Sequence, residues 1–349
     1  MSWLPPDDGD NDEPYGEYAD AVVRQRPNPK ANRPRTKRRP EHADAVVGIV
    51  TGVDRGRYQV LIPAGADPER QVVAARAREL RNTPIVIGDR AQLVGDTSGA
   101  EGTLARIVGL EERRTLLRRS ADDTDQLERV MVANADQMLI VVAAANPEPR
   151  VRLVDRYLVA AYDAGIAPLL VVTKTDVADP EAFLAQFAAL DIPVFRSRPG
   201  AEPLAEIRAA LAGRTTVFVG HSGVGKSTLI NALVPEANRA TGHVNEVTGR
   251  GRHTSSSSVA FRAPTPGCAG GESGWVIDTP GVRSFGLGHV TSDGVLRGFV
   301  DLAPLIDDCP RGCTHADDAP DCELDAAIAD GRLDGVGAAR VESLRRLLR

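Results

Sequence analysis

The chain has 349 residues, 42% of them apolar and 26% charged, with a formal net charge of −6 at pH 7, a composition typical of a globular protein with two or three domains. Its longest apolar run, Met138 to Ala145, is far too short to cross a bilayer, and the N-terminus lacks the basic start and apolar stretch of a secretory signal. Four cysteines do not form a disulfide framework in this length, and the negative charge argues against wrapping bulk DNA, so we predict a cytoplasmic protein without a membrane partner.

Residues 1–43 are predicted to be a disordered tail. The stretch from Asp7 to Asp20 is acidic, and the stretch from Arg24 to Arg39 is basic and contains several prolines. Neither stretch has a periodic apolar face whose burial could offset the entropy of ordering. A solvated tail is the expected state, and the alternative is that the basic stretch contacts phosphates.

Residues 44–112 have the pattern of a small β-barrel. A hairpin is predicted from VVGIVTGV, a turn at Asp54 to Gly56, and RYQVLI, and further β runs follow at 71–77, 85–94 and 103–108. Five short strands in about 65 residues suggest a closed barrel, but periodicity alone does not separate an OB-fold from an SH3-like barrel. The arginines of this segment are nearly balanced by acids, so the pattern is compatible with RNA binding without requiring it.

Residues 113–130 are predicted to be a charged connector, after which strands and helices alternate. The expected strands are 137–143, 168–173, 192–195, 215–219 and 275–278, and the expected helices are 151–163, 180–190, 204–211 and 226–234. Such alternation indicates a parallel sheet with helices on both faces. We therefore predict an α/β domain over residues 131–288.

A phosphate-binding loop is predicted at GHSGVGKS, which matches the GxxxxGK[ST] pattern and lies between an apolar strand and an amphipathic helix. Glycines let successive backbone N–H groups point at phosphate oxygens, and the helix N-terminus adds a favourable dipole. Lys226 is expected to reach the β- and γ-phosphates, and Ser227 is expected to offer its hydroxyl to Mg²⁺. The predicted nucleotide-binding residues here are Gly220, His221, Ser222, Gly223, Val224, Gly225, Lys226, Ser227 and Thr228.

TKTD, Thr173 to Asp176, ends a predicted strand and matches the [NT]KxD pattern of GTP-binding proteins. The Asp176 carboxylate can accept two hydrogen bonds from the guanine N1–H and N2–H₂ groups, a donor pair that adenine does not present. Lys174 can lay its aliphatic stem along the base. Thr173 stands where Asn is commoner, and a hydroxyl makes fewer hydrogen bonds than an amide. We expect Thr173, Lys174, Thr175 and Asp176 to bind the base of GTP or GDP.

DTPG, Asp278 to Gly281, follows the phosphate loop by about fifty residues at the end of a predicted strand. Asp278 is expected to hold Mg²⁺ through water, and the Gly281 N–H is expected to contact the γ-phosphate. Because TKTD precedes the phosphate loop, the motif order is the reverse of the usual one. Circular permutation is physically allowed, since a fold depends on contacts and chain termini often lie close together.

The segment 248–258 supplies further candidates for the chemistry. Thr254 or Ser255 could reach Mg²⁺ and the γ-phosphate, and His253 could approach the attacking water. Val282 stands where many GTPases carry a water-orienting Gln, so we expect slow intrinsic hydrolysis. The predicted catalytic residues are Lys226, Asp278, Gly281, His253 and Thr254.

A metal site is predicted in residues 289–349, which we expect to form a mostly helical zinc-binding domain. Cys309, Cys313, His315 and Cys322 have the spacing C-x3-C-x-H-x6-C, and four soft ligands this close suit a tetrahedral structural Zn²⁺. The ligand set is closed, so we assign it no catalysis. The last residues, 336–349, are predicted to be a basic amphipathic helix.

This order of a β-barrel, a permuted GTPase and a Cys3His segment resembles the ribosome small subunit-dependent GTPase A family (RsgA). The resemblance covers about residues 44–349 and is carried by TKTD, GHSGVGKS, GRHT at 251–254, DTPG and the Cys/His cluster. It implies an OB-fold that binds RNA, GTP hydrolysis stimulated by the small (30S) ribosomal subunit, and a role in the late maturation of that subunit.

The expected cofactors are one structural Zn²⁺ and Mg²⁺ with GTP, and the expected partners of the monomer are GTP or GDP, the small ribosomal subunit and its rRNA. Val282 favours an alternative, a nucleotide-gated ribosome-binding module with little turnover of its own.

Overall fold

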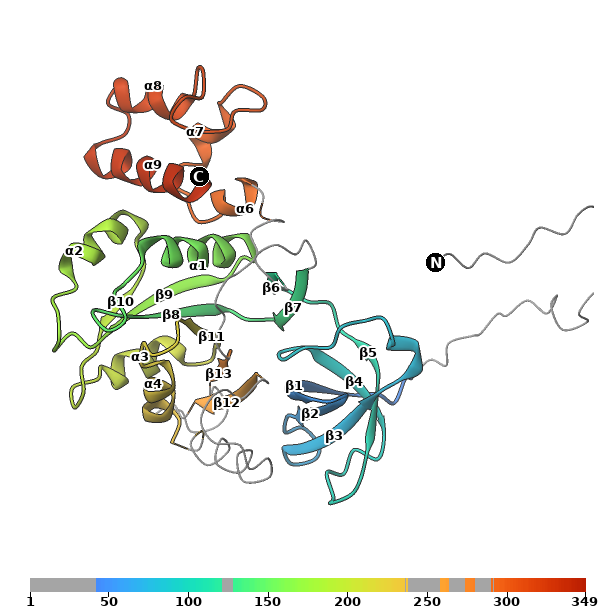
Figure 1. The fold of residues 1–349 in the computed structure, drawn as a ribbon. Helices are drawn as coiled ribbons and strands as arrows, with labels where there is room; N and C mark the ends of the chain where they lie inside the picture. Colours follow the sequence, from blue (N-terminus) through green and yellow to red (C-terminus); the bar gives the residue numbers. More distant parts are fainter. Residues whose placement is uncertain are drawn as a thin grey trace, which may run out of the picture. The chain divides into compact units, whose positions relative to one another are not determined.

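The computed structural model describes residues 42–120, 128–235, 237, 258–263, 274–279, 290 and 292–349. The first part is a closed five-stranded barrel (Figure 1). Its strands are β1 (Val46–Asp54), β2 (Arg57–Ile62), β3 (Arg70–Arg76), β4 (Arg90–Gly95) and β5 (Ala105–Leu110), with the short 3-10 helix η1 (Arg78–Leu80). The strand order is β1-β2-β3-β5-β4, and β4 pairs back with β1. The one parallel pairing, β3 with β5, distinguishes this OB-fold from an SH3-like barrel.

The strand predicted at 85–94 is shorter than expected, because only its last part pairs in the barrel. The fully buried Asp89 carboxylate accepts a hydrogen bond from the Val86 backbone N–H at 2.8 Å, which closes a turn before β4. Arg113 donates to the same carboxylate through Nε at 2.7 Å and Nη2 at 2.9 Å. The buried Asp89, with its bidentate arginine partner, therefore holds residues 86–89 in a turn, and the predicted strand 85–94 begins only at Arg90.

The predicted connector contains a hairpin that the sequence did not reveal. Strands β6 (Leu116–Ser120) and β7 (Glu128–Ala133) pair antiparallel. Leu117, Val132 and Ala133 are buried, but charged residues at the end of β6 and the start of β7, Arg118, Arg119, Glu128 and Arg129, interrupt the apolar alternation.

This hairpin joins the barrel through close backbone contacts. The Ala133 N–H donates to the Ile87 carbonyl at 2.9 Å, and the Asn134 side-chain amide donates to the Gly88 carbonyl at 2.8 Å. Gly88 has a φ of 86°, and a Cβ added there would lie 1.9 Å from the Ala133 carbonyl oxygen. Only glycine can occupy this joint, both for its backbone conformation and for its proximity to β7.

The central domain is a sheet with the order β10-β9-β8-β11-β13-β12. Its strands are β8 (Gln137–Ala143), β9 (Ala167–Thr173), β10 (Val194–Arg196), β11 (Thr215–Gly220), β12 (Val259–Ala263) and β13 (Gly274–Asp278). The strands from β10 to β13 are parallel, as predicted, but β12 runs antiparallel to β13 and was not predicted. It has only five residues, VAFRA, and pairs with β13, the next strand along the chain, and through Val259 with Gly52 of β1.

Helices cover both faces of this sheet (Figure 1). They are α1 (Val151–Asp163), α2 (Glu181–Leu184), the 3-10 helix η2 (Ala185–Leu190), α3 (Leu204–Leu211) and α4 (Lys226–Leu233). Along β8, Met138 and Ile140 contribute to the core beneath α1, and Leu139 and Val141 contribute to the core beneath α3 and α4. A strand buried on both faces needs apolar residues at nearly every position, and the run QMLIVVA is apolar after its first residue.

The C-terminal part consists of helices α6 (Ser292–Leu296), α7 (Ala303–Asp307), α8 (Glu323–Ala329) and α9 (Gly335–Leu348). Apolar side chains of α9 belong to the same core as those of α1. Arg346 of α9 forms an ion pair with Asp155 of α1 at 3.2 Å and donates to the Gln186 carbonyl of η2 at 2.8 Å. In the ranges that the structure describes, no helix has the length and apolar character needed to cross a membrane.

Candidate functional site

The predicted phosphate loop connects the end of β11 to the start of α4. A Cβ at Gly220 would lie 2.5 Å from the Val141 carbonyl oxygen, so the loop passes too close to β8 for any other residue. Gly223 and Gly225 have φ values of 82° and 93°, which glycine adopts without strain. Ser227 is exposed at the start of α4, where helix N–H groups lack intrahelical partners. The loop therefore offers backbone donors to an anion, with the Ser227 hydroxyl exposed beside them.

Lys226 and Asp278 meet at this loop. The Lys226 ammonium donates to the Asp278 carboxylate and to the Thr279 carbonyl, the latter at 3.0 Å. The two side chains of the ion pair are only 10% and 23% exposed. The Thr279 hydroxyl donates to the Phe218 carbonyl at 2.7 Å, which fixes the end of β13 against β11. The predicted phosphate-binding and Mg²⁺-binding side chains thus share one place, and a bound phosphate would have to compete with Asp278 for the ammonium.

The TKTD residues contact the phosphate loop directly, although about fifty residues separate the two motifs. The Thr173 hydroxyl lies 2.5 Å from the Val224 carbonyl oxygen. The Lys174 ammonium donates to the Gly223 carbonyl at 2.9 Å and to the Asn146 carbonyl. β9 and β11 flank β8 in a parallel arrangement, so their carboxyl ends lie at the same edge of the sheet. That topology explains why motifs in reversed order come together.

The segment after β10 lies beside TKTD. The backbone N–H and the hydroxyl of Thr175 each donate to the Ser197 carbonyl at 3.2 Å. Asp176, the next residue, is exposed and available to a ligand. Ser197, just after β10, therefore lies beside the predicted base-binding residues.

Three predicted site residues, His253, Thr254 and Gly281, lie outside the described residues. One contact was missed by the sequence analysis, namely the carbonyl of Asn146 that holds Lys174. Asn146 follows β8, and the carboxyl ends of parallel strands lie at one edge of the sheet, so its position in the sequence could have indicated that it lies near the site. The exposed His221 places its Nδ1 3.0 Å from the carbonyl oxygen of Ser222, its neighbour in the phosphate loop.

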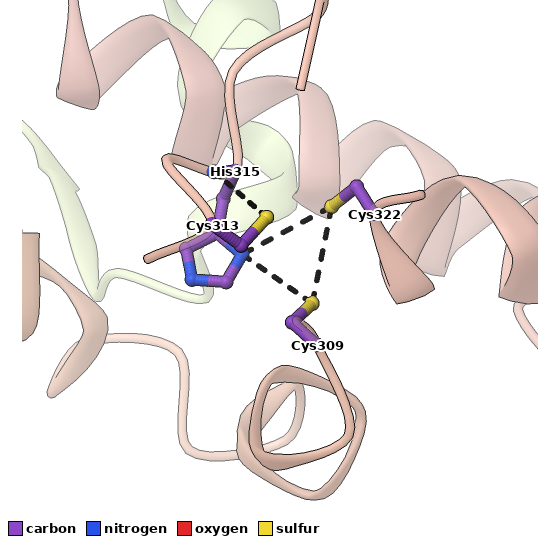
Figure 2. A group of neighbouring side chains, drawn as sticks. All are labelled: Cys309, Cys313, His315 and Cys322. Carbon is purple, nitrogen blue, oxygen red and sulfur yellow. Dashed lines mark hydrogen bonds between the residues drawn. The ribbon is translucent and has the colours of Figure 1, made fainter. Parts of the chain in front are cut away.

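The predicted metal ligands come together in the C-terminal part (Figure 2). Their four ligand atoms all lie within 4.8 Å of one another. The Cys309 Sγ is 3.6 Å from the His315 Nδ1 and 4.0 Å from the Cys322 Sγ, and the latter is 3.9 Å from the same nitrogen. Tetrahedral coordination with metal–sulfur bonds of about 2.3 Å calls for separations of roughly this size. The cluster can hold one metal ion.

Surrounding groups support these ligands. The Glu323 N–H donates to the Cys309 sulfur at 3.4 Å, and the His315 N–H donates to the Cys313 sulfur at 3.4 Å. Arg345 of α9 donates to the His315 carbonyl at 3.1 Å. Burial, with the neighbouring thiols adding to it, raises the pKa of Cys309 to about 11 in the metal-free cluster. A metal ion that takes this sulfur as thiolate must displace its proton.

Comparison with known proteins gives one consistent family. A family model described as RsgA GTPase matches residues 110–288. The small ribosomal subunit biogenesis GTPase RsgA of Pseudomonas fluorescens SBW25 is 41% identical over 272 residues, which cover 76% of this chain and 74% of that protein. The protein of the same name from Pseudomonas syringae pv. tomato DC3000 is 40% identical over 308 residues, covering 85% of this chain and 84% of the relative.

Two solved structures show the same fold. The crystal structure of YjeQ from Thermotoga maritima has a TM-score of 0.59 at 20% identity and covers 87% of this chain and 97% of its own. The structure of YloQ, a circularly permuted GTPase, has a TM-score of 0.58 at 24% identity and covers 89% of this chain and 97% of its own.

Proposed function

The chain belongs to the RsgA GTPase family, and from this membership we propose that it hydrolyses GTP in the cytoplasm to assist the late maturation of the small ribosomal subunit. The observation that carries the proposal is the direct contact of TKTD with the phosphate loop, through Thr173 to Val224 and Lys174 to Gly223. This contact supports a site in which the Asp176 carboxylate would select the base and the Lys226 ammonium would bind the phosphates of one nucleotide.

We propose the following roles for the described residues. Asp176 accepts the two guanine donors, and Lys226 leaves Asp278 to bind the β- and γ-phosphates. Ser227, and Asp278 through water, would hold Mg²⁺, which when bound would neutralise charge on the phosphate oxygens. The exposed Ser227 and the proximity of Asp278 to the loop fit that ion. His253, Thr254 and Gly281 remain predictions for the water and the γ-phosphate.

We propose that the barrel, residues 44–112, contacts rRNA through the outer face of β2, β3 and β5. Arg57 and Arg106 are exposed on this face, each directly beside Ala75 of the central strand. The exposed Gln59 and Val73 pair on the same face. Guanidinium groups for phosphates, with an amide and an apolar side chain for bases, suit a single-stranded or looped RNA, and the β2–β3 face is the usual ligand face of an OB-fold. We propose that the protein acts as a monomer.

The resident metal is proposed to be one structural Zn²⁺, since three thiolates and one imidazole are its usual ligands. Elemental analysis of the purified protein is expected to give one zinc per chain. Cys309→Ser should lose the metal and unfold the C-terminal helices, because metal binding at such sites supplies much of the folding free energy. Cys268→Ser, the same change at a cysteine outside the cluster, should retain one zinc. A fully folded wild-type protein without metal would refute the assignment.

The decisive test of function is steady-state GTP hydrolysis by the full chain with and without purified small ribosomal subunits. Without a glutamine at position 282, slow intrinsic turnover is expected, and small subunits should raise it about tenfold or more by completing the site. Large ribosomal subunits are the control and should have no effect. If small subunits bind in a GTP-dependent manner but leave turnover unchanged, the alternative of a nucleotide-gated binding module is favoured.

A further inference from the structure

The Thr173 hydroxyl faces two backbone carbonyls at once. Its Oγ1 lies 2.5 Å from the Val224 oxygen in the phosphate loop and 3.2 Å from the Val142 oxygen in β8. The residue is only 7% exposed, so water has little access to replace either bond. A hydroxyl has one proton and can donate only one full hydrogen bond, whereas an asparagine amide at this position would have two N–H donors.

The bond to Val224 controls a group that the nucleotide uses. In a planar trans peptide the C=O and the following N–H point in opposite directions. When the Val224 carbonyl is held toward Thr173, the Gly225 N–H must therefore point away from Thr173. Gly225 is also the residue on which the Thr173 side chain packs, since its Cβ position would lie 3.7 Å from the threonine methyl carbon.

We propose that Thr173 is a positioning residue whose single hydroxyl proton orients the Gly225 N–H for phosphate binding and thereby sets how fast the guanine nucleotide leaves. The proposal rests on the proposed function. Whenever the proton turns to Val142, the Val224–Gly225 peptide loses its tie, and the loop holds the phosphates less tightly. The nucleotide then exchanges faster than it would from a site with an asparagine at this position.

The test measures the affinity and the release rate of fluorescently labelled GDP on the full chain and on variants of residue 173. Thr173→Val keeps the shape and the packing on Gly225 but removes the proton, and it should weaken binding and speed release about tenfold. Thr173→Ser keeps the proton and should stay within about twofold of wild type. Thr173→Asn, with two donors, should release GDP more slowly than wild type.

Thr51→Val is the matched control. Thr51 is a buried threonine of the barrel whose hydroxyl also donates to a backbone carbonyl, that of Gln59 at 3.3 Å. Thr51→Val should leave the rate of GDP release unchanged. The melting temperature without nucleotide shows whether each variant folds.

Wild-type release from Thr173→Val would overturn the proposal, and so would a serine variant as fast as the valine variant. Release from Thr173→Asn at or above the wild-type rate would refute the one-proton limit. A wild-type chain that binds no guanine nucleotide would instead refute the proposed function, so the two failures are distinguishable.

Discussion

Asp176→Asn is expected to lower the affinity for GTP by roughly 10²–10⁴-fold, because two charge-assisted hydrogen bonds of about 1.5–3 kcal/mol each are weakened. The same change should raise the affinity for xanthosine triphosphate, whose ring presents a carbonyl where guanine has an amino group, since an asparagine amide can donate to that oxygen. Titration of the wild type and the variant with each nucleotide measures both changes in affinity. Asp176 is exposed, so the folded state itself should be little affected.

The control for this experiment is Asp191→Asn. Asp191 is exposed and has a φ of 50°, a conformation that asparagine tolerates, and it lies before β10, at the opposite edge of the sheet from TKTD. Asp191→Asn makes the same charge change and should leave the affinities for GTP and for xanthosine triphosphate unaltered. Equal binding of GTP and ATP by the wild-type protein would contradict the role of Asp176 in base choice and would favour an ATP-using enzyme.

Lys226→Ala is expected to abolish measurable nucleotide binding. Loss of one partner of a desolvated charge pair costs about 3 kcal/mol, or roughly a 150-fold drop in affinity, before the lost backbone geometry is counted. The same change leaves Asp278 without its cation, so the free energy of unfolding of the nucleotide-free protein should fall as well.

A second variant separates these two effects. Lys226→Ala combined with Asp278→Asn removes both charges, and it should recover part of the lost stability while nucleotide binding remains absent. Isothermal titration with GDP and thermal unfolding without nucleotide give the two quantities. Unchanged affinity for GTP in Lys226→Ala would remove the phosphate-loop assignment.

Those parts of the fold with a strong local period were predictable from the sequence. The strand 137–143 and the helices 151–163 and 204–211 have the predicted bounds, because a strand buried on both faces and an amphipathic helix each impose their own spacing. The hairpin of β6 and β7 and the strand β12 were missed. Each of these strands has only five or six residues, and arginines and small residues interrupt their apolar alternation.

The site shows the same division. Motif spacing predicted the side chains of Asp176, Lys226 and the metal cluster, since each proposed role needs a particular chemical group. The contacts that arrange them use backbone carbonyls, at Asn146, Val224 and Thr279, and a carbonyl is present at every residue. Such contacts carry no sequence signal. The ion pair of Lys226 with Asp278, and the position of the Thr173 hydroxyl between two carbonyl oxygens, are therefore seen only in the structure.

The glycine joint between the barrel and the β6–β7 hairpin limits how chimeras of this protein can be assembled. At Gly88 even a methyl group would collide with the Ala133 carbonyl. The Asn134 side-chain amide also donates a hydrogen bond to the Gly88 carbonyl. A barrel grafted from a relative must therefore arrive with its own turn at 86–89 and with the residues that receive it, Arg113 and 133–134. A chimera that takes the turn 86–89 from one protein and residues 113 and 133–134 from another would lose the contacts between them.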